Sequence, residues 1–247
     1  MHKCSIIMPC YHNFNLTKDA IDSIYAHTEG VDYNIIMIVD GYDKEYNEWL
    51  PYHKDINVIY HKYSQGFVNS CNEGLTKVNE ICKDTDYILL LNNDIVIEDD
   101  MWLKKMVDTF DENTGAVGCV SDWIMGVQKN IDDFKHLPKI HYATFLIGFC
   151  MLVRKDVFDI IGRLDTRFGM GGNDDLDLSI RMRLCGYDLK VNRNVFVHHI
   201  GSQSLPKATN VTDLEIKTRI WLNKKWGENL VNSLFNITNN FLLTGVD

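Results

Sequence analysis

Hydrophobic residues in the first half of the chain form short continuous runs, which alternate with segments of helical spacing. The continuous runs have a length typical of buried strands and cover residues 4–8, 33–39, 56–61 and 87–91. Residues 15–26 and 66–78 have helical spacing, and a further helix is predicted over residues 101–110. Such alternation predicts right-handed β-α-β crossovers. We therefore expect an α/β fold with a mostly parallel central sheet flanked by helices.

The pattern is less regular after residue 115. The strands predicted in this part cover residues 116–120, 144–153 and 187–197. The predicted helices cover residues 156–161, 173–185 with Gly186 as a stop signal, and 212–226. Residues 122–142 show no period and are interpreted as a loop over a candidate site, in which Trp123 is a candidate contact for a bound ligand.

The hydrophobic run at 87–91 ends abruptly in Asn92, Asn93 and Asp94. In open α/β sheets, ligands bind beyond the carboxyl ends of the strands. A carboxylate at this place can hold a divalent cation whose other ligands are phosphate oxygens. The other interpretation is a plain turn, because Asn and Asp are common turn residues.

Composition and charge narrow the classes of function. The 247 residues carry a net charge of -9, which argues against general electrostatic binding to a nucleic-acid backbone. The seven cysteines are scattered without a C-x-x-C spacing, so neither a disulfide framework nor a zinc site is expected. We find no signal peptide and no apolar run of the roughly 20 residues that a membrane span needs. These features predict a cytoplasmic protein.

Two further polar clusters complete the candidate chemistry. Asp174, Asp175 and Asp177 open the helix that follows the glycine-rich residues 168–172, and His199 ends the strand at 187–197. Carboxylates and a neutral imidazole suit Mg²⁺ or Mn²⁺, which bridge well to a diphosphate. Basic residues outnumber acidic ones in the tail, which is interpreted either as a phosphate or acceptor patch or as a solvated helix face.

The order of these motifs resembles family 2 glycosyltransferases of the GT-A fold over nearly the whole chain. The segments that carry the resemblance are Ser5-Ile-Ile-Met-Pro-Cys-Tyr11, Val39-Asp40-Gly41, Ser64-Gln-Gly-Phe67 with Asn72-Glu-Gly74, Leu89-Leu-Leu-Asn-Asn-Asp94, Asp174-Asp-Leu-Asp177 with Arg181 to Tyr187, His199-Ile-Gly-Ser-Gln-Ser204 and Lys225-Trp-Gly227. Two positions depart from the family pattern. Asn92 replaces the first Asp of D-x-D, and Asp174 replaces the Glu of E-D.

The resemblance implies a role for each matching residue. It implies that Asp175 is the general base, with Asp174 as the alternative, and that Asp94 and His199 hold a divalent metal, Mn²⁺ or Mg²⁺. The implied contacts to the nucleotide-sugar donor are Pro9, Tyr11, Asp40, Gly66, Asn72, Asn92, Asn93 and Asp94. The single domain 1–247 then has a nucleotide-sugar half at 1–114, a smaller mixed acceptor and catalytic half at 115–205, and a helical tail at 206–247.

The activity that the resemblance implies is inverting transfer of a sugar from a nucleoside diphosphate donor, expected to be a UDP-sugar, to an acceptor hydroxyl. The acceptor is left open among a saccharide, a lipid-linked sugar, a protein and a modified nucleic-acid base, and so is the oligomeric state. One alternative is a catalytically weak nucleotide-sugar-binding or scaffold protein that retains the fold. An enzyme that makes sugar nucleotides is disfavoured, because the glycine-rich, Lys-bearing opening of nucleotidyltransferases is missing.

Overall fold

Strands in the described part of the chain form one central sheet and a small second sheet. The computed structural model describes residues 2–122, 124, 126–130, 136–201 and 211–243. The central sheet has the order β3-β2-β1-β4-β8-β6-β9-β7. Its strands are β1 (Lys3–Cys10), β2 (Asp32–Asp40), β3 (Ile56–His61), β4 (Tyr87–Leu91), β6 (Thr114–Val120), β7 (Ile140–Tyr142), β8 (Cys150–Arg154) and β9 (Asp188–Phe196).

The sheet is parallel on its N-terminal side and mixed on its C-terminal side. Strands β3, β2, β1 and β4 are parallel neighbours, as are β6 and β9. Strand β8 runs antiparallel to both β4 and β6, and β7 runs antiparallel to β9. The carboxyl ends of β1, β2 and β4 therefore meet at one edge, which is where the motifs at Tyr11, Asp40 and Asn92 follow these strands.

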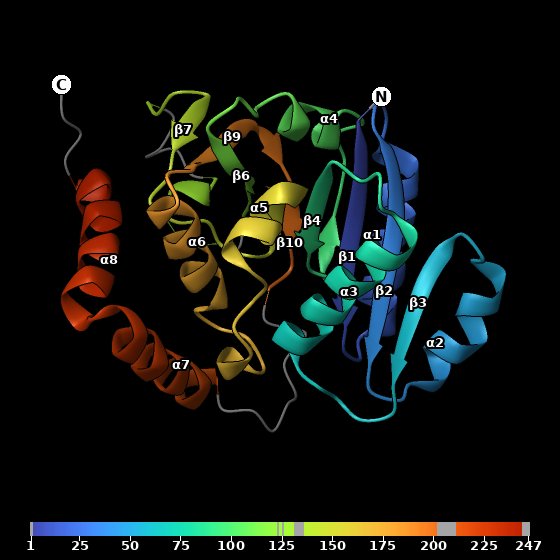
Figure 1. Ribbon diagram of the computed structural model, residues 1–247. Coiled ribbons are helices and arrows are strands. Elements are labelled where there is room, and N and C mark those ends of the chain that lie inside the picture. Colours follow the sequence, from blue (N-terminus) through green and yellow to red (C-terminus); the bar gives the residue numbers. More distant parts are fainter. Residues whose placement is uncertain (1, 123, 125, 131–135, 202–210, 244–247) are drawn as a thin grey trace.

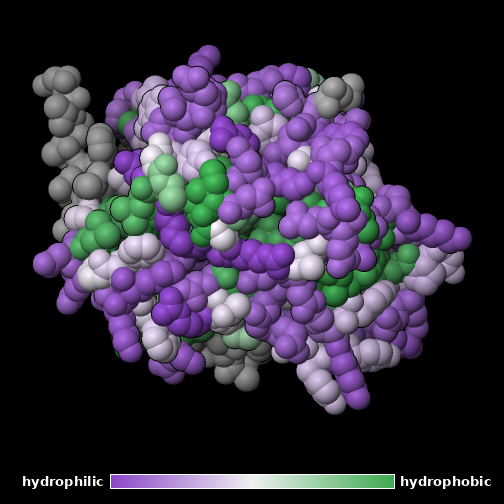
Figure 2. Space-filling model, in the orientation of Figure 1, coloured by the Kyte–Doolittle hydropathy of each residue, from purple (hydrophilic) through white to green (hydrophobic). Residues whose placement is uncertain are grey.

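Helices cover both faces of this sheet (Figure 1). One face packs against α1 (Phe14–His27) and α4 (Trp102–Val107), and the other against α3 (Phe67–Ile81), α5 (Lys155–Ile161) and α6 (Asp174–Leu184). Successive residues of a strand face opposite cores, as Ile6 and Ile7 do, so the strands are apolar on both faces. Polar residues predominate on the outer surface in Figure 2, as expected for amphipathic helices.

The predicted strand over residues 144–153 is wrong in its first part. Only Cys150–Arg154 forms a strand, β8. The backbone N–H groups of Leu146, Ile147 and Gly148 instead donate to side chains of Ser179, Gln128 and Asp175. These residues are hydrophobic enough for a strand, but side chains from distant segments bind their backbone.

Several elements were not predicted as such. They are α2 (Lys44–Trp49), the short 3-10 helices, β7, the pair β5 (Ile95–Val96) with β10 (His198–His199), and α8 (Glu228–Leu243). Helix α7 (Val211–Trp226) agrees with the predicted tail helix, and Figure 1 shows α7 and α8 at the side of the molecule next to α6. None of the described helices has the length and apolar character needed to cross a membrane.

Candidate active site

A cavity of about 300 Å³ opens at the carboxyl ends of β1, β2 and β4. Most residues that the sequence singled out line it, namely Pro9, Tyr11, Asp40, Asn92, Asn93, Asp94, Asp174, Asp175 and His199. The other residues that line the cavity are Cys10, Phe67, Ile147, Gly148, Phe149, Met170, Gly171, Gly172, Leu214 and Glu215. Its size falls in the range of small-molecule sites, which supports binding of a ligand such as a nucleotide.

Asp94 and His199 face each other at the bottom of one wall. The antiparallel pair β5–β10 brings them together, because His199 pairs with Ile95 and Ile200 donates its N–H to the carbonyl of Asp94 at 2.9 Å. Oδ1 of Asp94 lies 3.3 Å from Nε2 of His199 and has no hydrogen-bond partner in the described part of the chain. The Asp94 residue is only 1% exposed, so this oxygen is both buried and unsatisfied.

The amide of Asn92 lies beside the imidazole of His199. Its Nδ2 is 3.1 Å from His199 Nε2, and because an amide nitrogen donates, Nε2 accepts this hydrogen bond with its lone pair. Imidazole binds a metal through the same lone pair, so a cation at this place would take the position of the Asn92 donor. The unsatisfied carboxylate oxygen of Asp94, 3.3 Å from Nε2, would be a second ligand of the same ion. The described residues contain no cluster of three or more His, Cys, Asp or Glu side chains able to hold a metal, so phosphate and water would supply the remaining ligands.

A carboxylate outside the predicted site, that of Asp122, holds the backbone of His199 in place. Asp122 follows β6, and its side chain is hydrogen-bonded to His198 Nδ1 at 2.9 Å and accepts the backbone N–H of His199 at 3.1 Å. Desolvation opposes ionisation of Asp122, but these hydrogen bonds outweigh it and lower its pKa to about 2. Asp122 therefore fixes the strand that carries His199. The irregular sequence around Asp122 offered no signal for this contact.

Asp174 and Asp175, which also line the cavity, lie in the first turn of α6. Asp175 is partly exposed, and its two oxygens accept the backbone N–H groups of Gly148 at 3.0 Å and Leu176 at 2.8 Å. Burial, followed by the charge of Asp175, raises the pKa of Asp174 to about 7. Burial also raises the pKa of Asp175, but the backbone donors oppose this effect. In this pair, the proton therefore lies preferentially on Asp174.

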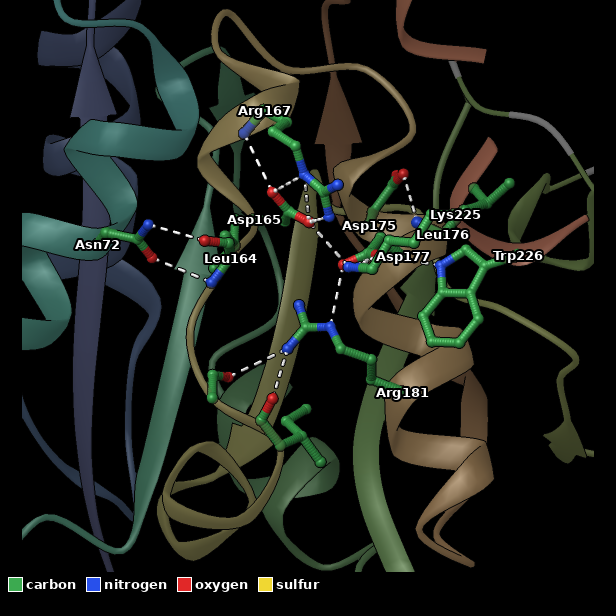
Figure 3. A network of polar contacts seen from close by, with 12 residues as sticks. Asn72, Leu164, Asp165, Arg167, Asp175, Leu176, Asp177, Arg181, Lys225 and Trp226 are labelled. Carbon is green, nitrogen blue, oxygen red and sulfur yellow. Dashed lines mark hydrogen bonds and ion pairs between the residues drawn. The ribbon is translucent and has the colours of Figure 1, made fainter. Parts of the chain in front are cut away.

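Asp177 is turned away from the cavity. Its carboxylate is fully buried, with Oδ2 accepting from Arg181 Nε at 2.9 Å and Oδ1 accepting from Lys225 Nζ at 2.6 Å and Trp226 Nε1 at 2.8 Å. Figure 3 shows this network beside the loop of Asp165, which also binds Lys225 at 2.8 Å. The Lys-Trp pair of the tail thus anchors α7 to α6.

Asp40 lines the cavity with a carboxylate that already has four donors. Oδ1 is hydrogen-bonded to His61 Nδ1 and the Gln65 N–H, each at 2.7 Å, and Oδ2 to Ser64 Oγ at 2.7 Å and the Gly66 N–H at 3.0 Å. Desolvation opposes these bonds, but together they lower the pKa of Asp40. Asp40 thereby holds in place the loop after β3, which leads to the lining residue Phe67.

Gly66 and Asn72 are not among the described residues that line the cavity. The Asn72 amide is bonded to the backbone of Leu164 in both directions, donating at 2.9 Å and accepting at 3.0 Å (Figure 3). Gly66 has a φ of +87°, and a Cβ there would lie 2.7 Å from the carbonyl oxygen of Gly169. Both residues position cavity walls through contacts that the sequence motif does not reveal.

The lining of the cavity is acidic. Among the described residues, no Lys or Arg contributes to it, whereas Asp40, Asp94, Asp174, Asp175 and Glu215 do. A nucleoside diphosphate bound in this cavity would therefore have little positive protein charge beside it. Trp123 and the last three residues of the His199 motif, Ser202 to Ser204, lie outside the described residues.

Two solved structures share this fold. The mannosyltransferase PcManGT from Pyrobaculum calidifontis, in complex with GDP-Man and Mn²⁺, matches with a TM-score of 0.64 and 17% identity over 83% of this chain and 57% of its own. GalNAc-T7, with UDP, GalNAc and Mn²⁺, matches with a TM-score of 0.68 and 13% identity over 87% of this chain and 47% of its own. At these identities the likeness concerns the fold, which is the expected GT-A fold.

The sequence comparisons agree with the fold. The O-antigen biosynthesis protein RfbC of Myxococcus xanthus is 21% identical over 229 residues, a segment that spans 80% of this chain and only 17% of that protein. Residues 5–162 match the family described as "Glycosyl transferase family 2". Since this match covers more than half of the 247 residues, the chain belongs to glycosyl transferase family 2.

Proposed function

We propose that this chain transfers a sugar from a nucleoside diphosphate donor to an acceptor hydroxyl, with inversion at the anomeric carbon. The observation that carries the proposal is the cavity itself. The Asp94–His199 pair and the Asp174–Asp175 pair both line it, which supports a site that binds a donor and an acceptor together. We propose the same division along the chain as the sequence suggested, with the donor half at 1–114, the acceptor and catalytic half at 115–205, and the tail at 206–247.

Asp94 and His199 are the proposed protein ligands of a divalent metal. The unsatisfied Oδ1 of Asp94 and its distance of 3.3 Å from His199 Nε2 support this assignment. A bound Mn²⁺ or Mg²⁺ would stabilise the negative charge that develops on the departing diphosphate. It would supply positive charge that the described lining residues, which include no Lys or Arg, do not supply.

Asp175 is the proposed general base. It takes the proton of the acceptor hydroxyl while the new bond forms between that oxygen and the anomeric carbon. The bond from the anomeric carbon to the phosphate oxygen breaks, and its electron pair leaves with the diphosphate. The backbone donors of Gly148 and Leu176 keep Asp175 ionised more readily than Asp174, which supports Asp175 as the base. A single displacement of this kind inverts the configuration.

The donor contacts are proposed at the carboxyl ends of β1, β2 and β4. The Tyr11 ring would lie 3.7 Å from a Cβ built at Gly41, the residue after Asp40. We propose that Pro9 and Tyr11, which line the cavity, pack against the nucleobase of the donor. Asn92 and Asn93 are proposed to lie against ribose and diphosphate. A UDP-sugar is our first candidate for the donor, and GDP-Man and UDP are the ligands named for the two similar structures.

The cellular setting is proposed from the thiols. All seven cysteines are free, including the buried Cys119 and Cys150, as expected in a reducing compartment such as the cytoplasm. An acceptor hydroxyl on a saccharide, a lipid-linked sugar, a protein or a modified nucleic-acid base fits the reaction.

Nucleotide binding tests the donor site. We expect one of UDP, GDP and dTDP to raise the melting temperature in the presence of Mn²⁺, and Asp94→Ala to abolish this rise. The exposed Asp159 on α5 provides a matched control, since Asp159→Ala should leave the rise unchanged. A rise that persists in Asp94→Ala would reject Asp94 as a metal ligand.

Hydrolysis of the donor tests the catalytic role. Asp175→Asn should lower hydrolysis of the nucleotide sugar at least 100-fold and leave nucleotide binding intact, because it removes only the base. Wild-type protein that binds the nucleotide sugar but neither hydrolyses nor transfers it would favour the alternative, a binding or scaffold protein.

A further inference from the structure

The C-terminal helix α7 contributes side chains to the cavity that the reaction described above does not use. Leu214 and Glu215 line it next to Asp174 and Asp175. Thr218, one turn after Glu215, accepts a hydrogen bond from Asn173 Nδ2 at 2.9 Å, and Asn173 directly precedes Asp174. Because residues three apart lie on the same side of a helix, Glu215 is directed toward the start of α6.

Two sets of contacts hold α7 in this position. In the middle of α7, Thr218 is buried and hydrogen-bonded to Asn173, and a Cβ at Gly172 would lie 3.3 Å from the Thr218 hydroxyl. At its end, Lys225 and Trp226 bind the buried carboxylate of Asp177 (Figure 3). Since both anchors lie on or beside α6, the place of Glu215 relative to the carboxylates of α6 is set by the fold.

The carboxylate of Glu215 is available to a ligand. The residue is exposed, and no hydrogen bond or ion pair links its carboxylate to another described residue. A carboxylate can only accept hydrogen bonds, so it suits the hydroxyl groups of a saccharide. It repels a phosphate or a carboxylate, and it does so next to two further carboxylates.

We propose that Glu215 is a specificity-determining residue of the acceptor subsite, where it accepts a hydrogen bond from a hydroxyl of a neutral saccharide and excludes anionic acceptors. This inference rests on the proposed function, since it concerns the acceptor side of the same cavity. It adds a substrate class and assigns to α7 the wall that receives the acceptor.

Transfer to matched acceptors tests the proposal. The donor would be the nucleotide sugar that the protein hydrolyses, and the acceptors would be methyl glucoside, methyl galactoside and methyl mannoside, each beside its 6-phosphate and its uronate. We expect wild-type protein to use neutral members. Glu215→Gln should raise the KM for them about tenfold or more, because a hydrogen bond to a charged group is lost. Glu215→Lys should shift the ratio of neutral to anionic transfer at least tenfold toward the anions.

The controls separate this proposal from the proposed function. Donor hydrolysis by water is measured for each variant, and its transfer rates are divided by this rate, so that an effect on the donor reaction is separated from a change in acceptor choice. Glu228→Gln, a change at an exposed position at the start of α8, should leave both reactions unchanged. If wild type prefers anionic acceptors or uses none of the neutral ones, or if Glu215→Lys leaves the ratio unchanged, the proposal is overturned. Lack of donor hydrolysis in wild type would instead count against the proposed function.

Discussion

Replacement of Asp174 by Asn should stabilise the protein in a manner that depends on pH. Burial, followed by the charge of Asp175, raises the pKa of Asp174 from 3.8 to about 7. The folded state therefore binds a proton more tightly than the unfolded state. Such a group contributes its full stability below pH 3.8, and this contribution is lost as the pH rises toward 7.

The magnitude follows from the two pKa values. At 1.36 kcal/mol for each pKa unit, ionisation of Asp174 costs the folded state about 4 kcal/mol above pH 7. About 2–3 kcal/mol of this is lost between pH 5 and pH 8. Asn has nearly the same shape and does not ionise, so Asp174→Asn avoids this loss. Its stability relative to wild type should therefore rise by about 2–3 kcal/mol from pH 5 to pH 8.

Urea unfolding of wild type and Asp174→Asn at pH 5, 6, 7 and 8 measures this difference. Histidines such as His61 and His198 contribute equally to the free energy of unfolding of both proteins, so their titration cancels when the two are compared at each pH. Asp159→Asn, a change at an exposed position on α5, should show no such trend. A difference between Asp174→Asn and wild type that stays constant within about 0.5 kcal/mol across this range would refute the reasoning.

Two further changes test the packing around the cavity. Asp177→Ala should lower the free energy of unfolding by about 3 kcal/mol or more in urea titrations, because it leaves buried cationic partners without their carboxylate. Asp156→Ala, which removes an exposed ion pair, should cost under about 1 kcal/mol, and equal losses would contradict the assigned network. Gly74→Ala should lower the melting temperature and reduce the free energy of unfolding by about 1–3 kcal/mol, because the added Cβ would overlap Ile7 Cγ2. Unchanged stability would contradict this and show that β1 moves aside for the Cβ.

Local patterns predicted the elements that carry the donor side. The strands at Ile56–His61 and Tyr87–Leu91 have the predicted bounds, because each is a short apolar run between polar residues. Asp40 at the end of β2 and Asp94 after β4 line the cavity as expected, since parallel strands end at a common edge. Periodicity and strand ends are local properties, so the chain displays them directly.

Local patterns did not predict the contacts between distant segments. Asn72 and Asp177 belong to recognisable motifs, yet the first binds the backbone of Leu164 and the second binds the tail. Residues 144–149 are apolar like a strand, but side chains from elsewhere, including that of Asp175, accept their N–H groups. A polar side chain has the same local pattern whether it binds a ligand or another segment, so only the fold distinguishes the two.

The sequence by itself determined the α/β class, the order of the strands along the chain and the family to which the motifs belong, because these depend on local hydrophobic period and on short motifs. Only the tertiary structure decided that the β5–β10 pair joins Asp94 to His199 and that α7 brings Glu215 beside Asp174 and Asp175. Both arrangements result from packing between segments far apart in the chain, and no local pattern records which segments will meet.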